Sequence, residues 1–371
     1  MKHLKTLLML VVAMGAVGCS TLAKKDDTGV IIARRAQVRS STAVVAADLL
    51  EVNRGDVIDI LDSEAAENGE SWLRVRAHDE QNTEGWIESR NVMPQNILDQ
   101  SRELAAQDTD IPAQASGQLR ATANLRLSPD RSNNDNILMK MDNGSTFEIV
   151  GWKRVPKPKS SETTESDDAP KTGSVQPNPR RGRRGDSDAP KEPEETNELW
   201  YKVRLQPSTS PAPAGWVFGK QVELMVPSDI IFYRTGREFV AWQRLDDEAD
   251  TSNAATKDKD AAKEAKPGSW VILEKSSSNE PRKLDEPDFD RIYVLGYDKS
   301  NQEHYTAYRS PDLKGLLPLR VEGRGDSKSF IISVQDADGQ VKEAKYSLYR
   351  DDRGVLKVTP PSEASKGRKK K

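Results

Sequence analysis

The feature that most constrains the fold of this 371-residue chain is an internal repeat. Short motifs recur in the same order in two segments, at residues 29–93 and 117–225. The matching stretches are Val38-Arg39 with Leu125-Arg126, Gly55 with Gly144, Trp72-Leu73-Arg74-Val75-Arg76 with Trp200-Tyr201-Lys202-Val203-Arg204, and Gly85-Trp86-Ile87 with Gly215-Trp216-Val217. The offset between matching residues is larger late in the repeat than early in it, so the second copy carries an insertion.

Each copy has the sequence pattern of short β-strands. Ile58 and Ile60 alternate with Asp59, as in a strand with one buried and one exposed face. The second copy keeps the same alternation at its matching positions. Arg54-Gly55-Asp56 has the residue types of a turn that precedes such a strand. The chain is therefore expected to be mainly β.

The order of these motifs resembles bacterial Src homology 3 domains. The resemblance covers most of both copies and implies two small barrels of about five strands each. Trp86 and Trp216, in the closing Gly-Trp strand, are interpreted as packing residues of the barrels. A domain this small buries only about 60% of its unfolded surface, so each barrel is expected to be marginally stable.

The Trp-x-x-Val strand of each copy carries the candidate ligand contacts. Trp72 and Arg74 share a strand face in the first copy, and Trp200 and Lys202 occupy the matching positions of the second. An aromatic ring on a half-exposed face can stack on a sugar or a peptide. A neighbouring cation can bind a carboxylate. Two interpretations stay open, namely that these tryptophans bind a ligand or that they cap the core.

The segments outside the two barrels differ strongly in composition. Residues 94–116 are expected to form a linker with a short helix near 96–108. Residues 155–195, inside the second copy, are rich in proline, serine and charge and are expected to be disordered. The basic run at 180–184 is either an anion contact or part of a solvated loop.

The C-terminal part no longer follows the repeat. Residues 226–358 are expected to form an antiparallel β sandwich or open barrel, and residues 359–371 a basic disordered tail. The expected strands lie at 230–233, 239–245, 270–274, 291–297, 305–308, 330–334, 344–349 and 355–358.

The first 19 residues indicate export and lipid attachment. Lys2 and Lys5 precede a short apolar run and the small residues Ala16-Val17-Gly18, so residues 1–18 have the pattern of a signal peptide. Cys19 is the only cysteine in the chain and follows directly. This arrangement resembles the lipobox of bacterial lipoproteins, which implies that Cys19 is acylated and that residues 19–28 form the tether. The resemblance further implies the periplasmic face of the outer membrane.

Catalytic and metal-binding motifs are absent from the sequence. There are three histidines, no His-x-x-x-His or Cys-x-x-Cys spacing and no Gly-x-Ser-x-Gly. The formal net charge of −3, which becomes more negative once Lys2 and Lys5 are removed, argues against a nucleic-acid binder. We expect no enzyme activity and no cofactor.

Two functions remain open at this stage. In the first, the protein is held to the membrane through Cys19 and its tandem barrels bind peptidoglycan or its stem peptides. In the second, it is a non-catalytic accessory lipoprotein that docks on another envelope protein through the C-terminal β domain.

Overall fold

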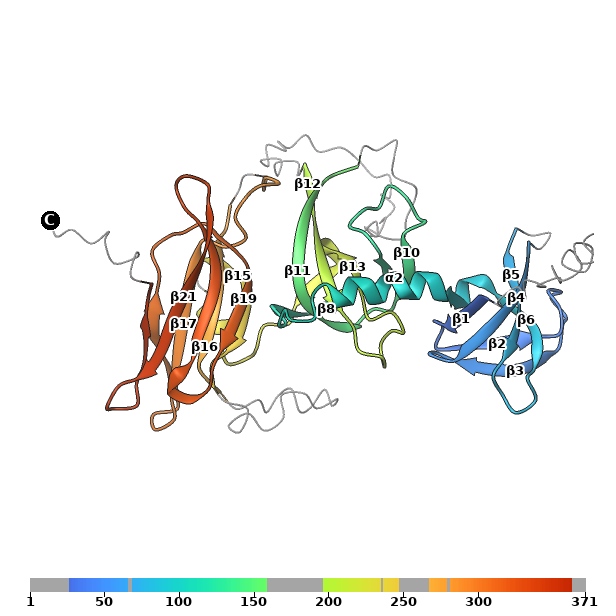
Figure 1. Cartoon of the computed structure of the whole chain (residues 1–371), viewed down its shortest axis with the longest axis horizontal. Coiled ribbons are helices and arrows are strands. Elements are labelled where there is room, and N and C mark those ends of the chain that lie inside the picture. The colour runs from blue at the N-terminus through green and yellow to red at the C-terminus, as the bar shows by residue number, and fades with distance from the viewer. Residues whose placement is uncertain are drawn as a thin grey trace, which may run out of the picture. The chain divides into compact units, whose positions relative to one another are not determined.

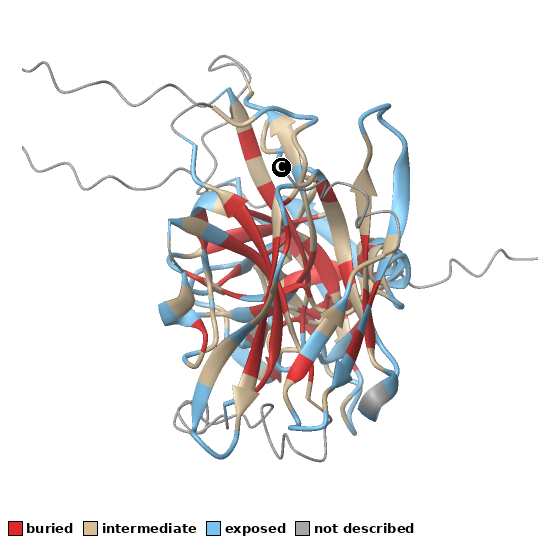
Figure 2. Cartoon of the chain, turned by 90° about the vertical axis from the view of Figure 1, so that its left-hand side faces the viewer, coloured by how far each residue is buried: buried red, intermediate tan, exposed pale blue. Residues whose placement is uncertain are grey.

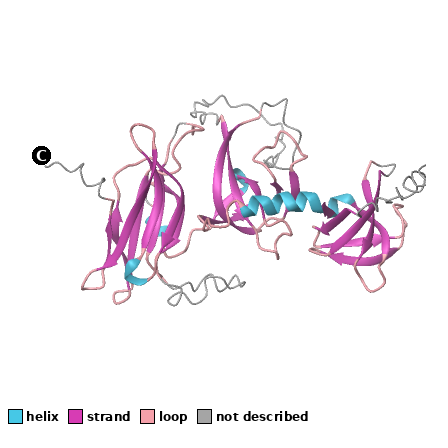
Figure 3. Cartoon of the chain, in the orientation of Figure 1, coloured by secondary structure: helices cyan, strands magenta, loops and turns pink. Residues whose placement is uncertain are grey.

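The computed structural model describes residues 27–65, 69–158, 196–234, 236–246, 267–278 and 281–361. These residues form four antiparallel sheets and one α-helix, α2, at Gln95–Ala106 (Figure 3). The expectation of a mainly β protein is confirmed. The chain divides into two compact units, residues 1–95 and 96–371, which are described separately.

The first unit is built on one seven-stranded sheet (Figure 1). In chain order its strands are β1 (Asp27–Ile31), β2 (Arg35–Arg39), β3 (Asp48–Asn53), β4 (Val57–Ala65), β5 (Ser71–Ala77), β6 (Glu84–Glu88) and β7 (Val92–Pro94), and the 3-10 turn η1 (Ser89–Asn91) lies between the last two. Their order across the sheet is β3-β2-β6-β5-β4-β1-β7.

The first sheet curls around a single core. Each of its seven strands contributes a buried side chain to one cluster, which consists of Ile31, Ala36, Val38, Val52, Ile58, Val75, Ile87 and Val92. A flat sheet could not bring side chains from its first and seventh strands into one cluster. The first copy is therefore barrel-like, with one face inside and the other outside.

The second copy repeats this strand order. Its sheet has the order β10-β9-β13-β12-β11-β8-β14. The strands are β8 (Ala115–Leu119), β9 (Ala123–Arg126), β10 (Ile137–Met141), β11 (Thr146–Pro156), β12 (Asn197–Arg204), β13 (Ala214–Phe218) and β14 (Val222–Leu224), with η2 (Gly219–Gln221) before the last. Each copy has seven strands rather than the five expected, because the first and last strands of the copy pair with each other as a short extra ladder.

The repeated Gly-Trp motif has a steric cause. A Cβ added to Gly85 would lie 2.5 Å from the carbonyl oxygen of Arg39, and one added to Gly215 would lie 2.6 Å from a side-chain carbon of Leu125. Real Cβ atoms do not approach other atoms this closely. In the first copy the clash is with a backbone atom, so this point of the closing strand requires glycine, whereas in the second copy a larger residue would require the Leu125 side chain to shift.

The C-terminal part of the second unit is a sandwich of two four-stranded sheets. One sheet contains β15 (Arg237–Arg244), β16 (Trp270–Ser276), β17 (Arg291–Asp298) and β18 (Glu303–Arg309). The other contains β19 (Gly315–Glu322), β20 (Ser329–Gln335), β21 (Val341–Arg350) and β22 (Leu356–Thr359), with η6 (Gly325–Ser327) before β20. Both sheets supply side chains to one core, including Val271, Val294, Leu319, Phe330 and Leu348. Figure 2 shows the buried positions concentrated in the middle of the strands.

The second barrel and the sandwich form one unit because Gln114 joins them. Its side chain is fully buried, donates to the carbonyl oxygen of Leu319 at 3.0 Å and accepts from the backbone N–H of Leu319 at 2.7 Å. The backbone carbonyl oxygen of Gln114 accepts a hydrogen bond of 2.9 Å from the backbone N–H of Trp242. The boundary expected near residue 226 therefore separates two sheets but not two compact units.

Several element boundaries differ from those expected. The tether expected at 19–28 overlaps β1, which begins at Asp27. The insertion expected at 155–195 begins later, because β11 continues to Pro156 and pairs there with Asn197. The rest of that insertion, including the basic run, lies outside the described residues. Residues 1–26 and 362–371, on which the predicted signal peptide, Cys19 and most of the predicted tail fall, also lie outside them.

Two assignments in the C-terminal part are wrong. Ile231–Tyr233 is a 3-10 helix, η3, and not a strand. Strand β19 was not among the expected strands, and it contains Pro318, a residue that central strands usually exclude. Pro318 is tolerated because the pairing of β19 with β20 is interrupted between Leu316 and Arg320.

Candidate functional site

The candidate ligand contacts lie on the outer face of the barrels. In the first copy the strand register places Trp86 between Arg39 and Arg74. Directly paired residues of antiparallel strands project to the same side of a sheet. The second copy has the same cross-strand row, formed by Arg126, Trp216 and Lys202.

Trp72 and Trp200 do not offer a ring to a ligand. Trp72 is 3% exposed and Trp200 is fully buried. The guanidinium of Arg39 lies 5.8 Å from the Trp72 ring centroid. The same side chain holds the following loop by donating to the carbonyl oxygens of Val44 and Ala46, at 2.9 and 3.2 Å. Of the two interpretations left open by the sequence, burial supports the one in which these tryptophans are packing residues.

The second copy buries its tryptophan in a related way. The ring of Trp200 lies 5.4 Å from that of Phe218, and the guanidinium of Arg131 lies 5.1 Å from the Phe218 ring. Within the described residues, the indole N–H groups of Trp72 and Trp200 have no hydrogen-bond partner. Leaving such a group unpaired costs about 1–3 kcal/mol. Burial of the ring outweighs that cost, since removing a buried tryptophan side chain costs about 3–5 kcal/mol.

The closing-strand tryptophans have the opposite placement from the one expected. Trp86 and Trp216 are only half-buried, while their neighbours Ile87 and Val217 are fully buried in the barrel interior. Successive side chains of a strand point to opposite faces. The interpretation of Trp86 and Trp216 as core residues is therefore corrected, because the core position of this strand belongs to the next residue.

In the second copy, α2 and the residues that follow it contact strands β12 and β13; the helix is labelled in Figure 1. The hydroxyl of Ser101 donates to the carbonyl oxygen of Ala214 at 2.6 Å and accepts from its N–H at 3.2 Å. The ammonium of Lys202 contacts Asp108 at 2.5 Å and donates to Gln107 at 3.0 Å. Lys202 is 8% exposed. This cation is thus engaged by the chain itself.

Arg204 secures the segment that follows α2. Its guanidinium donates to the carbonyl oxygens of Asp108 and Ile111, at 2.7 and 3.0 Å. Cations near the C-terminal end of a helix also interact favourably with the helix dipole. Lys202 and Arg204 together therefore hold the C-terminal end of α2 against β12.

In the first copy, the matching cations are paired within the barrel. Arg76 and Arg74 both contact Glu84, at 2.8 and 3.1 Å. The hydrogen bond from Arg76 lowers the pKa of the Glu84 carboxyl, and the charge of Arg74 adds to this effect. The Arg74 side chain is 51% exposed. Its guanidinium therefore remains accessible to an anion from solution.

One residue difference between the copies explains why Lys202 and Arg204 bind the end of α2 whereas Arg74 and Arg76 bind a carboxylate of their own barrel. Glu84 of the first copy is replaced by Ala214 in the second, directly before the Gly-Trp motif. Without a carboxylate at that position, Lys202 and Arg204 can bind the end of α2. Sequence reasoning did not identify this docking site, although a comparison of the two copies at residues 84 and 214 contains the signal.

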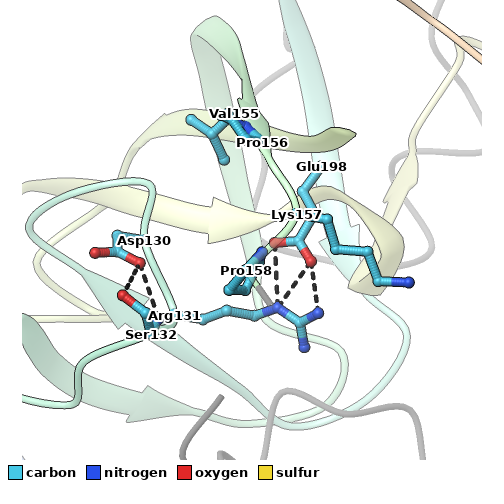
Figure 4. Close-up of a pocket in the computed structure, with 8 residues that line it drawn as sticks. All are labelled: Asp130, Arg131, Ser132, Val155, Pro156, Lys157, Pro158 and Glu198. Atoms are coloured by element: carbon cyan, nitrogen blue, oxygen red, sulfur yellow. Dashed lines mark hydrogen bonds and ion pairs between the residues drawn. The ribbon is translucent and has the colours of Figure 1, made fainter. Parts of the chain in front are cut away.

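The second barrel also has a pocket of about 300 Å³ beside the end of β11 (Figure 4). Arg131 projects into it and forms a two-pronged ion pair with Glu198, whose shortest contact is 2.5 Å. Glu198 is 4% exposed. Hydrogen bonds from the N–H and hydroxyl of Ser132 lower the pKa of Asp130 in the pocket wall. The charge of Arg131 is neutralised by Glu198, so this ion pair has a structural role.

Metal binding, membrane crossing and histidine chemistry can be judged over the described ranges. They contain no group of three or more His, Cys, Asp or Glu side chains placed to hold a metal ion. No α-helix there has both the length and the apolar character needed to cross a membrane. His78 is half-exposed and bonds Asp59 at 3.0 Å, whereas His304 is nearly buried beside Asp229.

Comparisons with known proteins leave the family open. No family model matches the chain, and no curated protein does. Among solved structures, it is similar to NlpC2 from Trichomonas vaginalis, with a TM-score of 0.16, 9% identity, and coverage of 90% of this chain and 91% of that chain. It is also similar to NlpC1 from the same organism, with a TM-score of 0.15, 10% identity, and coverage of 92% and 96%. TM-scores this low carry no argument about fold or function.

The contrast between the tryptophans gives a stability prediction. Trp200→Ala removes a fully buried ring and should lower the free energy of unfolding by about 3–5 kcal/mol. Trp216→Ala removes a half-buried ring of the same size and should cost much less. Urea denaturation of the full chain, followed by far-UV circular dichroism, measures both. Equal losses for the two variants would contradict the assignment.

The docking of α2 gives a second prediction. Lys202→Met leaves the Asp108 carboxylate without its cation in a nearly buried place, which should cost about 3 kcal/mol. A helix of 12 residues is marginal without packing, so the amide hydrogens of α2 should exchange faster while the barrel core stays protected. Hydrogen exchange with mass spectrometry measures this. Arg74→Met, at the matching exposed position, is the control and should leave α2 unchanged.

Proposed function

We propose that this chain is a lipid-anchored binding protein of the bacterial cell envelope, without catalytic activity. Its first Src homology 3-like barrel would contact peptidoglycan through the acidic groups of the stem peptides. The observation that carries this proposal is the contrast between two equivalent faces. Lys202 is engaged by α2, whereas Arg74 is half-exposed on the first barrel.

The open face of the first barrel has suitable chemistry for such a ligand. Arg74 and Arg76 supply guanidinium groups, which bind carboxylates in a planar, two-pronged geometry. Trp86 is half-buried in the same cross-strand row and supplies an aromatic surface. Glu84 shares both arginines, so the ligand's carboxylate has to compete with it and binding should be weak.

The second barrel would have a different role in this proposal. The equivalent cation is already paired, and the barrel is joined to the sandwich through Gln114. It would therefore act as a support that holds the sandwich. The alternative, an accessory lipoprotein that docks on another envelope protein through the C-terminal β domain, becomes the leading function if peptidoglycan binding fails.

Membrane attachment is tested by Cys19→Ser. Acylation at Cys19 would hold the protein permanently, because two or more acyl chains give stable anchoring whereas one binds reversibly. We expect wild-type protein in the membrane fraction and the Cys19→Ser protein in the soluble fraction after a high-salt wash. A variant that stays with the membranes would rule out the lipid anchor.

Peptidoglycan binding is tested by sedimentation with purified sacculi at low salt. The Cys19→Ser full chain should sediment, and an added Arg74→Glu substitution should abolish this, because it places a negative charge where the stem-peptide carboxylate would bind. Arg35→Glu makes the same charge change at a side chain that is 75% exposed on β2 and serves as the matched control. If the parent protein stays in the supernatant, or if both variants lose binding equally, the proposal fails.

A further inference from the structure

A cleft lies between the second barrel and the sandwich, within the second unit. Its volume is about 140 Å³, and strands β11, β12 and β15 contribute to its lining together with the segment that connects barrel and sandwich. Apolar side chains form much of its wall, among them Leu199, Leu224, Phe239 and Val240. Clefts between packed domains, with apolar walls and a few polar groups, are the usual places for small ligands.

Tyr201 is one of the polar groups of this cleft that the described part of the chain leaves without a partner. It is 9% exposed, and within the described part of the chain no hydrogen bond to its hydroxyl is found. Burial raises the pKa of Tyr201 to about 12, and the charges that act on it in addition are Arg154 and Glu238, both in the cleft lining. Buried tyrosine hydroxyls usually have a partner, and Tyr201 lines the cleft, where a bound ligand can supply one.

Most other polar groups of the cleft already have partners. Both carboxylate oxygens of Asp288 are occupied, one by the indole N–H of Trp152 at 2.6 Å and one by the N–H of Leu317 at 2.9 Å. Lys275 and Arg282 both pair with Glu286, at 3.0 and 2.9 Å. These groups hold the cleft together and are not available to a ligand.

Two arginines in the cleft lining differ from the paired cations Lys275 and Arg282. Across the residues that the structure describes, the guanidinium groups of Arg154 and Arg234 have neither an ion-pair nor a hydrogen-bond partner. Arg154 belongs to β11 and is partly buried, and Arg234 is exposed at the mouth. Unpaired arginines beside an unpaired tyrosine hydroxyl are suited to a carboxylate, which accepts several hydrogen bonds at once.

We propose that this cleft binds the C-terminal carboxylate of a peptide whose last side chain is apolar. Arg154 and the Tyr201 hydroxyl would donate to the carboxylate, Arg234 would add charge at the mouth, and the apolar wall would receive the last side chain. An acidic sugar fits less well, because its hydroxyl groups need several free partners and Asp288, Lys275 and Arg282 are already bonded. This site is separate from the open face of the first barrel and does not depend on it.

Calorimetric titration of the Cys19→Ser full chain tests the proposal. The probe is the N-acetylated tripeptide Ala-Ala-Leu with a free carboxylate, and the reference is the same peptide with a C-terminal amide. We expect millimolar or tighter binding of the acid and at least tenfold weaker binding of the amide, since hydrogen bonds to charged groups contribute that much. Absence of binding at 10 mM acid, or equal binding of acid and amide, would overturn the proposal.

Single substitutions in the cleft test which side chains contact the peptide carboxylate. Arg154→Gln should weaken binding about tenfold or more, and Tyr201→Phe, which removes only the hydroxyl, several-fold. Lys153→Gln changes an exposed cation next to Arg154 on the same strand and should have no effect. Circular dichroism checks that each variant is folded.

The sign of the ligand's charge is tested independently. Glu238→Gln removes a negative charge from the lining and should strengthen binding of an anion several-fold. Weaker binding by this variant, or binding of D-glucuronic acid in preference to the tripeptide, would exclude a peptide carboxylate as the ligand.

Discussion

The ion pair between Lys202 and Asp108 is the first link in a series of contacts that organises the second unit. It fixes the end of α2 to β12. Arg204 then holds the carbonyl oxygens of Asp108 and Ile111, so the chain is guided along the barrel toward β8. At the end of this path, Gln114 bonds both backbone groups of Leu319 in the sandwich. A buried amide with several satisfied partners is costly to break, because each group left unpaired adds about 1–3 kcal/mol.

The two barrels show how one fold acquires two different surfaces. Both keep the same strand order, the same buried tryptophan and the same glycine in the closing strand. At one outer position Glu84 neutralises its neighbours, and at the equivalent position Ala214 leaves them free to bind a helix. Since the inner face is unaffected by this change, the outer face can differ without any cost to the core.

The strand pattern, the repeat and the sandwich could be predicted from the sequence, because alternation of apolar and polar residues reports directly on which face of a strand is buried. The placement of the tryptophans could not. Alternation put Trp72 on the outer face correctly, but the guanidinium of Arg39 lies 5.8 Å from its ring centroid, and this contact is not local in the sequence. Likewise, nothing near Lys202 shows that Asp108, from a segment far back in the chain, would reach it.

The cleft at the seam of the second unit follows from the same long-range contacts. When a barrel and a sandwich are joined at Gln114 and again where Trp152 bonds Asp288, the two surfaces cannot be complementary everywhere between these points. Lys275 and Arg282 of the cleft lining pair with Glu286, in the loop between β16 and β17. Arg154 and Tyr201, in contrast, line the cleft without such partners among the described residues. A ligand that satisfies them would favour the joined arrangement over a separated one, because it contacts both parts only when they are packed together.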